Sequence, residues 1–256
     1  MKKTLLQILN LIAFIATAVI NILSTTIPLG YGDPGELSDL IPNLFVPEGL
    51  TFSIWGIIYF FLALFSIYQM RDIFKTEKIE MPFFDKIGIL FILSSLANIS
   101  WIFLWQYLFV PWSLLAMIVL LIMLILIYLR LNIGKTKFST TEKLTVQIPF
   151  SIYLGWITVA TIANVTAVLV DTFGVPSFGF EAEIWTILVI IVAITITYLT
   201  LFLRRDVAYS LVIVWALLGI YIKQSGLNLT VATTALIALI VVLVGIILVG
   251  IKWLKK

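Results

Sequence analysis

The sequence predicts an all-α fold: a polytopic membrane bundle of about eight transmembrane helices, with both termini in the cytoplasm. Three observations support it, namely an apolar composition, eight long apolar segments and an alternation of basic residues between the connections. Hydrophobic residues make up 62% of the 256 residues and charged residues only 11%, whereas about a quarter of a typical soluble domain is charged. The chain is therefore expected to lie in a bilayer.

Eight apolar segments are long enough to cross the membrane, because a spanning helix needs about 20 predominantly apolar residues. Together with short connections they leave no room for a water-soluble domain. The tight junction between the third and fourth segments predicts a helical hairpin. The segments cover residues 5–28, 50–70, 87–109, 112–129, 144–170, 184–203, 207–222 and 229–251.

The first segment begins with lysines and an apolar run that imitate a secretory signal, with a small-residue triplet at residues 16–18. Its apolar run continues through Ile20 and Ile22 toward Thr26. That length favours a retained span, and cleavage as a signal is the alternative.

Lysine and arginine residues predict the orientation of the spans. We number the connections between the eight segments along the chain. The odd-numbered connections hold Lys223 as their only basic residue, together with several Asp and Glu residues. Because cytoplasmic loops are enriched in Lys and Arg, both termini are expected on the cytoplasmic side. The even-numbered connections and the termini hold Lys2, Lys3, Arg71, Lys75, Lys78, Lys86, Arg130, Lys135, Lys137, Lys143, Arg204, Arg205, Lys252, Lys255 and Lys256.

The composition excludes several classes of function. Cys and His are both absent, so disulfides, thiol nucleophiles, the usual zinc ligands and the commonest axial ligands of haem are excluded. The net charge of +3 is scattered among apolar spans and forms no basic stripe, so no nucleic-acid partner is expected. Membrane lipid is the expected surrounding partner.

An aromatic face is expected at the start of the second segment, in "PEGLTFSIWGIIY". Phe52, Trp55 and Tyr59 are three and four residues apart, so on a helix their rings share one face. The third segment contains "ANISWIFLW" and the fifth "WITVATIAN", with the same kind of spacing. The residues on these two faces are Asn98, Trp101 and Trp105, and Trp156, Ala160 and Asn164.

Two interpretations of these three faces stay open. An Asn side chain in hydrocarbon is costly unless it is paired, so Asn98 and Asn164 should point into the bundle together with their neighbours. The residues then either fill space between packed helices or line a flat-walled cavity for a planar apolar ligand.

The same strings resemble the tryptophan-rich sensory protein family, also called translocator protein or peripheral-type benzodiazepine receptor. In that family one helix carries F-x-x-V-W-x-x-L-Y, a later helix L-N-x-x-W, and the last helix P-Y-x-x-W-x-x-x-A-x-x-x-N. The resemblance implies a five-helix core at residues 1–170, with three additional transmembrane helices at 171–256 packed on it. It also implies that residues 30–49 form a long loop over a pocket; on composition alone that loop is equally a lid or a linker.

The resemblance implies an integral membrane binding or sensory protein for planar hydrophobic ligands such as porphyrins or sterols. No cofactor is required; a bound tetrapyrrole would be held by stacking and shape, because His and Cys are absent. The ligand-binding residues carried over from the resemblance are Phe52, Trp55, Tyr59, Asn98, Trp101, Trp156, Ala160 and Asn164.

Two other functions stay open. A secondary transporter of a small hydrophobic molecule fits eight spans, although no charged residue lies near the middle of a span. An enzyme that promotes porphyrin breakdown ranks last, because no hydrolytic triad, metal cluster or phosphate loop is evident. We expect a multi-pass protein of the cell membrane, the prokaryotic plasma membrane in particular, and a homodimer is a further expectation.

The orientation can be tested with reporter fusions. A reporter fused after Lys256 should be cytoplasmic, and one inserted near Asp33 should be external, because the basic residues set the topology. Accessibility to an impermeant label measures both positions. An external C-terminal reporter would contradict the count of eight spans.

Overall fold

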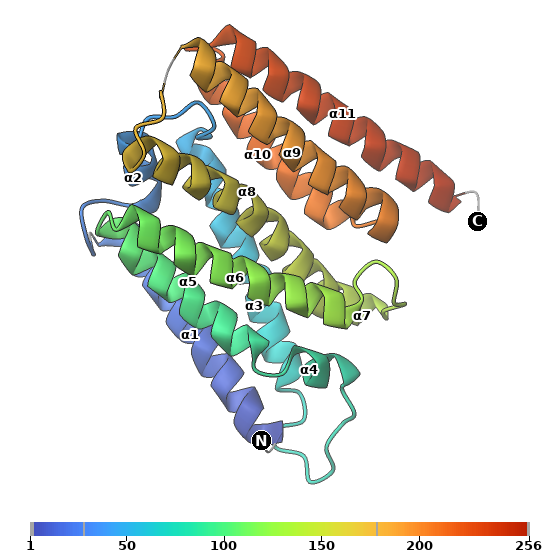
Figure 1. Cartoon of the computed structure of the whole chain (residues 1–256). Helices are drawn as coiled ribbons and strands as arrows, with labels where there is room; N and C mark the ends of the chain where they lie inside the picture. The colour runs from blue at the N-terminus through green and yellow to red at the C-terminus, as the bar shows by residue number, and fades with distance from the viewer. Residues whose placement is uncertain (1–2, 28, 178, 255–256) are drawn as a thin grey trace. The chain divides into compact units, whose positions relative to one another are not determined.

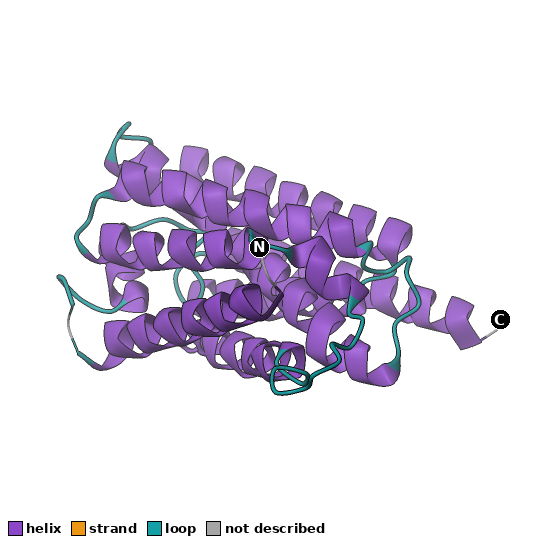
Figure 2. Ribbon diagram, turned by 90° about the horizontal axis from the view of Figure 1, so that it is seen from below, coloured by secondary structure: helices purple, strands orange, loops and turns teal. Residues whose placement is uncertain are grey.

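The computed structural model describes residues 3–27, 29–177 and 179–254, of which residues 252–254 by backbone alone. Every regular element in these ranges is helical (Figures 1 and 2). The all-α membrane-bundle prediction is therefore confirmed. Lys2, Lys255 and Lys256, which contribute to the predicted orientation, lie outside the described residues, so the orientation stays a prediction.

Seven of the described helices are long and apolar enough to cross a membrane. The third predicted span is shorter: α5 has 17 residues, about 26 Å at 1.5 Å per residue. Its segment is interrupted at Gly88 and Leu108, which both have positive φ values. The seven long helices are Lys3–Thr26, Gly49–Gln69, Val110–Leu131, Thr140–Asp171, Phe180–Arg204, Val207–Gln224 and Leu229–Ile251.

The chain divides into two compact units. Unit 1 comprises Met1–Pro34 and Trp55–Leu154, and unit 2 comprises Gly35–Ile54 and Gly155–Lys256. Helix α8 (Ile148–Asp171) supplies residues to both. The division into a five-helix core at 1–170 and three additional helices at 171–256 stays a prediction.

Unit 1 contains α1 (Lys3–Thr26), most of α3 (Ile54–Gln69), α4 (Pro82–Ile87), α5 (Leu90–Gln106), α6 (Val110–Leu131), α7 (Thr140–Glu142), a π-helical turn (Lys143–Gln147) and the start of α8. Helix α5 packs on α1 and on α6, and the α5–α6 pair forms the predicted hairpin (Figure 1). Phe65, Phe91 and Phe150 meet edge to face, with ring centroids 5.0–6.1 Å apart. This aromatic core joins α3, α5 and α8.

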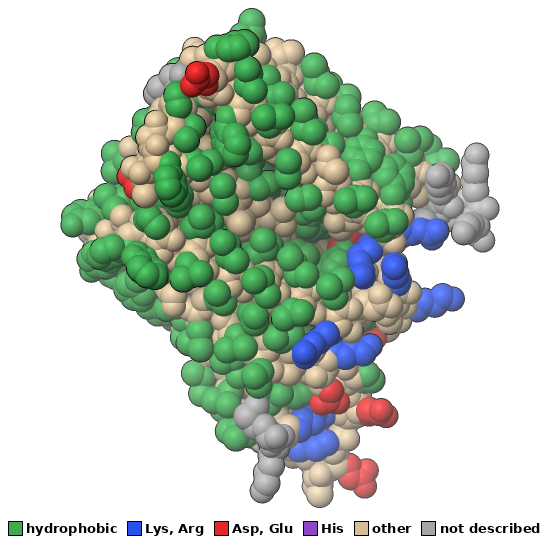
Figure 3. All heavy atoms as spheres, in the orientation of Figure 1, with side chains coloured by type: hydrophobic (Ala, Val, Ile, Leu, Met, Phe, Trp, Pro, Cys, Tyr) green, Lys and Arg blue, Asp and Glu red, His purple; other side chains and the backbone are tan. Residues whose placement is uncertain are grey.

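Helix α1 is inverted relative to a helix of a soluble protein. Its polar side chains are buried within the structure, and its large aliphatic side chains are exposed. Hydrophobic side chains also cover much of the face drawn in Figure 3. Such a surface suits hydrocarbon rather than water. The exposed residues of α1 include Leu5, Ile8, Ile12, Ile15, Val19 and Ile22.

A buried carboxylate connects the start of α1 to the turn after α3. Asp72 accepts hydrogen bonds from Nζ of Lys3 (2.7 Å), Nε2 of Gln7 (2.7 Å) and the backbone N–H of Ile79 (2.8 Å). Burial acts to raise the pKa of Asp72, but these donors outweigh it and lower the pKa to about 2. The charged form of Asp72 therefore stabilises this end of unit 1.

Unit 2 contains α2 (Pro34–Leu40) apart from its first residue, a 3₁₀ helix (Gly49–Ser53), the rest of α8, α9 (Phe180–Arg204), α10 (Val207–Gln224) and α11 (Leu229–Leu254). The helices α9, α10 and α11 pack on one another in all three pairs. Asp206 caps α10, because its side chain accepts the N–H of Tyr209 at 3.1 Å. The three predicted C-terminal spans therefore form a bundle.

The long connection before the aromatic helix is bound to α10 along much of its length. The N–H of Glu48 donates to the carbonyl of Gly219 (3.0 Å), and Nε2 of Gln224 donates to the carbonyl of Leu44 (3.1 Å). Lys223 and Asp39 form an ion pair. The part of the connection in unit 2 is thus anchored to a helix instead of crossing open solvent.

Gly219 permits this close approach. A Cβ atom built on Gly219 would lie 3.0 Å from Cβ of Pro47 and of Thr51, and would overlap the Thr51 hydroxyl. Nε1 of Trp215, one turn earlier in α10, donates to the carbonyl of Thr51 at 2.9 Å. Only glycine lets the 3₁₀ helix pack directly on the α10 backbone here.

Replacing Asp72 tests the buried carboxylate. Asp72→Asn should lower the free energy of unfolding at neutral pH by about 1–3 kcal/mol, because Lys3 loses its charged partner. The folded pKa is lowered, so the contribution is complete above the unfolded value of 3.8 and is lost as the pH falls through about 2. Thermal unfolding of wild type and variant should converge in that window. The exposed Glu77→Gln is the control, and an equal loss there would contradict the assignment.

Replacing Gly219 tests the anchored connection. Gly219→Ala should destabilise unit 2 by about 1–3 kcal/mol through overpacking, and should accelerate hydrogen exchange of the Glu48 amide. Gly250→Ala is the matched control, because a Cβ atom there meets nothing within 4 Å. Unchanged exchange at Glu48 in the Gly219 variant would show that the connection is not held by α10.

Candidate functional site

Five aromatic residues of unit 1, Trp55, Tyr59, Trp101, Trp105 and Tyr153, form what we call the Trp55 cluster. Trp55 stacks on Tyr59, with ring centroids 5.7 Å apart and planes 13° apart. Trp101 stacks on Trp105 at 6.1 Å and 16°. Trp55 joins the two pairs through Trp101 at 6.2 Å and meets the edge of Tyr153 at 6.3 Å. The cluster therefore joins α3, α5 and α8 through ring contacts.

A hydrogen-bonded chain orients the helices beside the cluster. Nδ2 of Asn21 donates to Oδ1 of Asn98 (2.7 Å), and Nδ2 of Asn98 donates to the hydroxyl of Tyr153 (3.1 Å). Asn98 is fully buried. Both polar atoms of its amide thus already bond to protein, so a ligand contact from Asn98 would use the second lone pair on Oδ1 or the second N–H of Nδ2.

The hydroxyl of Tyr59 is the polar edge of the cluster. It is buried and makes no hydrogen bond of acceptable geometry, although Asn98 and Tyr153 are near enough to interact with it electrostatically. The indole N–H of Trp105, in contrast, donates to the carbonyl of Pro34 at 3.1 Å. Beside Asn98, the Tyr59 hydroxyl keeps hydrogen-bonding capacity for a further partner, because a hydroxyl both donates and accepts.

A second aromatic contact lies in unit 2. Phe52, in the 3₁₀ helix, meets Trp156 of α8 edge to face, with centroids 5.9 Å apart. Trp156 is buried, and Ala160 and Asn164 follow it at intervals of four residues along α8. Phe52 thus belongs to a turn that precedes α3, whereas the spacing had suggested one continuous helical face.

The predicted ligand-binding residues separate into two groups. Trp55, Tyr59, Asn98 and Trp101 come together in unit 1, and Phe52, Trp156, Ala160 and Asn164 belong to unit 2. No ligand contact tests these eight assignments, which stay predictions.

The structure adds Asn21 and Tyr153 to the unit 1 group, and it places there Trp105, which was predicted on the face of the third segment but not as a ligand-binding residue. Trp105 and Tyr153 have the same spacing of three or four residues from Trp101 and Trp156 that identified the other aromatics. Asn21 has no aromatic neighbour in sequence, and only the burial of the polar face of α1 identifies it.

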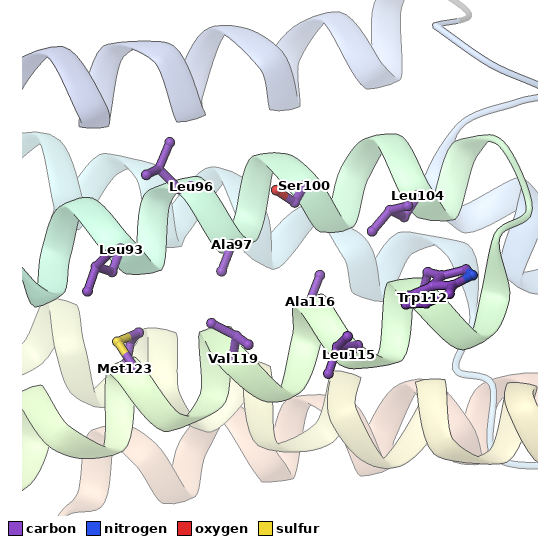
Figure 4. A pocket seen from close by; sticks show the side chains of 10 residues that line it. All are labelled: Leu93, Leu96, Ala97, Ser100, Leu104, Trp112, Leu115, Ala116, Val119 and Met123. Carbon is purple, nitrogen blue, oxygen red and sulfur yellow. The ribbon is translucent and has the colours of Figure 1, made fainter.

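An apolar groove lies between α5 and α6 (Figure 4). Its volume is about 440 Å³. Trp112 at one end is largely exposed, and Ser100 supplies the polar side chain of the wall. No pattern in the sequence indicated this groove. Its walls are Leu93, Leu96, Ala97, Ser100, Leu104, Trp112, Leu115, Ala116, Val119 and Met123.

Comparison with known proteins identifies the family. No curated protein and no solved structure matches the chain. A family model described as "TSPO-like protein" matches residues 7–248, which include α9, α10 and most of α11. The resemblance seen in three helices therefore extends over nearly the whole sequence, and the chain belongs to the family of TSPO-like proteins.

Proposed function

We propose that this membrane protein binds or senses a planar hydrophobic ligand at the Trp55 cluster. The observation that carries the proposal is the arrangement of two stacked pairs, Trp55–Tyr59 and Trp101–Trp105, joined through Trp55 and Trp101. The ring faces that these contacts leave free would stack on a flat apolar molecule, since offset stacking is a favoured aromatic geometry. Family membership supports the same class of function.

The chemistry of the cluster favours a porphyrin or a sterol-like molecule. Ring faces provide stacking, and the Tyr59 hydroxyl can donate to or accept from one polar group at the ligand edge. The chain has no His or Cys, so a bound tetrapyrrole would be held by stacking and shape. No cofactor is required for such binding.

The remaining predicted residues complete the proposal. Phe52, Trp156, Ala160 and Asn164 belong to unit 2 and stay proposed ligand-binding residues of that unit, with Ala160 leaving space beside the indole of Trp156. We keep the five-helix core at residues 1–170 as the ligand-binding part and assign the three further helices a scaffold role. A location in a prokaryotic plasma membrane and assembly as a homodimer are part of the same proposal.

A second candidate function is a secondary transporter of a small hydrophobic molecule. The groove between α5 and α6 favours it, because the groove is open, almost wholly apolar and large enough for part of such a molecule. The groove would provide a binding site on unit 1 for a solute that arrives from the lipid. No comparable observation favours an enzyme, and the described residues contain no group of three or more Asp or Glu residues suited to a metal ion.

A titration with protoporphyrin tests the ligand and the site together. Binding to the purified full chain should be saturable, and Trp55→Phe should weaken it by about 1 kcal/mol, several-fold in affinity, through loss of a stacking face. Trp156→Phe tests the unit 2 group in the same way. The change of the Soret band measures affinity, and thermal unfolding measures stability.

Trp112→Phe is the matched control, because Trp112 lies in the groove and outside the Trp55 cluster. Its substitution should leave protoporphyrin affinity unchanged. Affinity that falls in the Trp112 variant but not in the Trp55 variant would place the ligand in the groove and favour the transporter. If neither protoporphyrin nor a sterol shows saturable binding, and Trp55→Phe lowers only stability, the cluster is a packing core.

A further inference from the structure

Polar residues follow one face of α1 from end to end. They are separated by three, four or seven residues and therefore lie on one side of the helix. Each is buried, with at most 8% of its surface exposed. This face points into unit 1, where α3 and α5 present further polar groups to it. The residues are Gln7, Asn10, Thr17, Asn21 and Ser24.

Five buried oxygen atoms of unit 1 have no hydrogen-bond partner in the protein. They are Oε1 of Gln7, Oδ1 of Asn10, the hydroxyl of Tyr59, Oγ of Ser66 and Oε1 of Gln106. Exchanging the oxygen and nitrogen atoms of the Gln7 or Gln106 side-chain amide would still leave an amide oxygen without a hydrogen bond. Nε2 of Gln7 already donates to Asp72 and to a carbonyl, and Nε2 of Gln106 donates to two carbonyls.

These oxygens are spread along α1 rather than gathered at one end. Gln7 and Asn10 lie near the start of α1, and Gln106 is bonded to the carbonyl of Ser24 near its end. Residues 7 to 24 of a helix span about 26 Å, close to the roughly 30 Å of bilayer hydrocarbon. Ser66 and Tyr59 lie on α3, which runs in the opposite direction, and Gln69 in its last turn bonds to Asn10. Along the axis of α1, Ser66 and then Tyr59 therefore lie between Asn10 and Gln106.

Two further hydroxyl groups of unit 1 are buried, that of Thr17 on the polar face of α1 and that of Ser94 on α5. Thr17 donates to the carbonyl of Ala13, and Ser94 donates to that of Phe91, both at 2.8 Å. A hydroxyl that donates to its own helix still has lone pairs to offer. The polar face thus offers acceptor oxygens at short intervals along most of the membrane thickness.

The missing partner must donate hydrogen bonds, because three of the five oxygens are amide carbonyls that only accept. It must also be small, since the oxygens are distributed along a helix. We infer that unit 1 binds a line of internal water molecules along the polar face of α1. Buried polar groups without protein partners are the usual sites of ordered water.

A bound cation is the less suitable occupant. No Asp or Glu occurs in α1, α3 or α5, and the Asp72 carboxylate at the end of the line is already paired with Lys3. An intramembrane cation would be expected near a carboxylate. The inference shares only the Tyr59 hydroxyl with the proposed ligand site, and the oxygens of Gln7, Asn10, Ser66 and Gln106 support it without Tyr59.

Water contact can be measured directly by water-edited solid-state NMR of the full chain in lipid bilayers. Magnetisation should pass from water to Ser66 several-fold faster than to Ser113. Both serines are fully buried, and each lies three residues from a helix end, but Ser113 donates to the carbonyl of Val110. Gln7, Asn10 and Gln106 should show the fast transfer as well. Equal transfer to Ser66 and Ser113 would overturn the inference.

Two further readouts separate water from the alternatives. Ser66→Ala removes a hydroxyl with no protein partner; in a hydrated line it should leave the melting temperature unchanged or lower, whereas at a dry site it should raise it. A raised melting temperature would therefore overturn the inference. So would shifts of the Gln7 and Asn10 signals on exchanging sodium for a large organic cation, which would identify an ion instead of water.

Discussion

The requirement that polar groups in hydrocarbon find partners inside the protein governs this structure. The hydrogen-bonded chain from Asn21 through Asn98 to Tyr153 meets it at the level of the aromatic residues. Because each member comes from a different helix, the chain fixes which way α1, α5 and α8 face. The stacking of Trp55 on Tyr59 and its contact with Trp101 depend on that orientation.

The same requirement explains the inverted character of α1 and the anchoring of the long connection. Along α1, polar side chains turn inward and aliphatic ones outward, so no polar group faces lipid at mid-helix. In unit 2, a backbone N–H of the connection donates to the carbonyl of Gly219, and the carbonyls of Leu44 and Thr51 accept hydrogen bonds from Gln224 and Trp215 of α10. A segment bound in this way moves only when those bonds break, which distinguishes it from a freely hinged lid.

The two apolar features of unit 1 differ in what they can hold. The Trp55 cluster presents flat rings, buried at Trp101, Trp105 and Tyr153 and half-buried at Trp55 and Tyr59. Together with the Tyr59 hydroxyl they give a ligand both stacking and an orienting contact. The groove between α5 and α6 is wider and almost wholly aliphatic, so it offers contact area but little orientation. Both features use α5, since Trp101 and Trp105 belong to the cluster and Leu93, Leu96 and Ser100 line the groove.

The sequence by itself determined the helical membrane class, the positions of the spans and the family, because length, hydropathy and the spacing of aromatic residues are local properties. It also identified Trp55, Tyr59, Asn98 and Trp101 as neighbours, since Asn must turn inward and carries its helical face with it. Tertiary structure decided the rest. Local periodicity does not specify how helices approach one another. That approach decides the pairing of Asn98 with Asn21 and Tyr153, the fit of Thr51 against Gly219, and the groove beside α6. Phe52 shows the same limit, because it lies in a 3₁₀ helix before α3 and its ring meets Trp156, neither of which local spacing predicts.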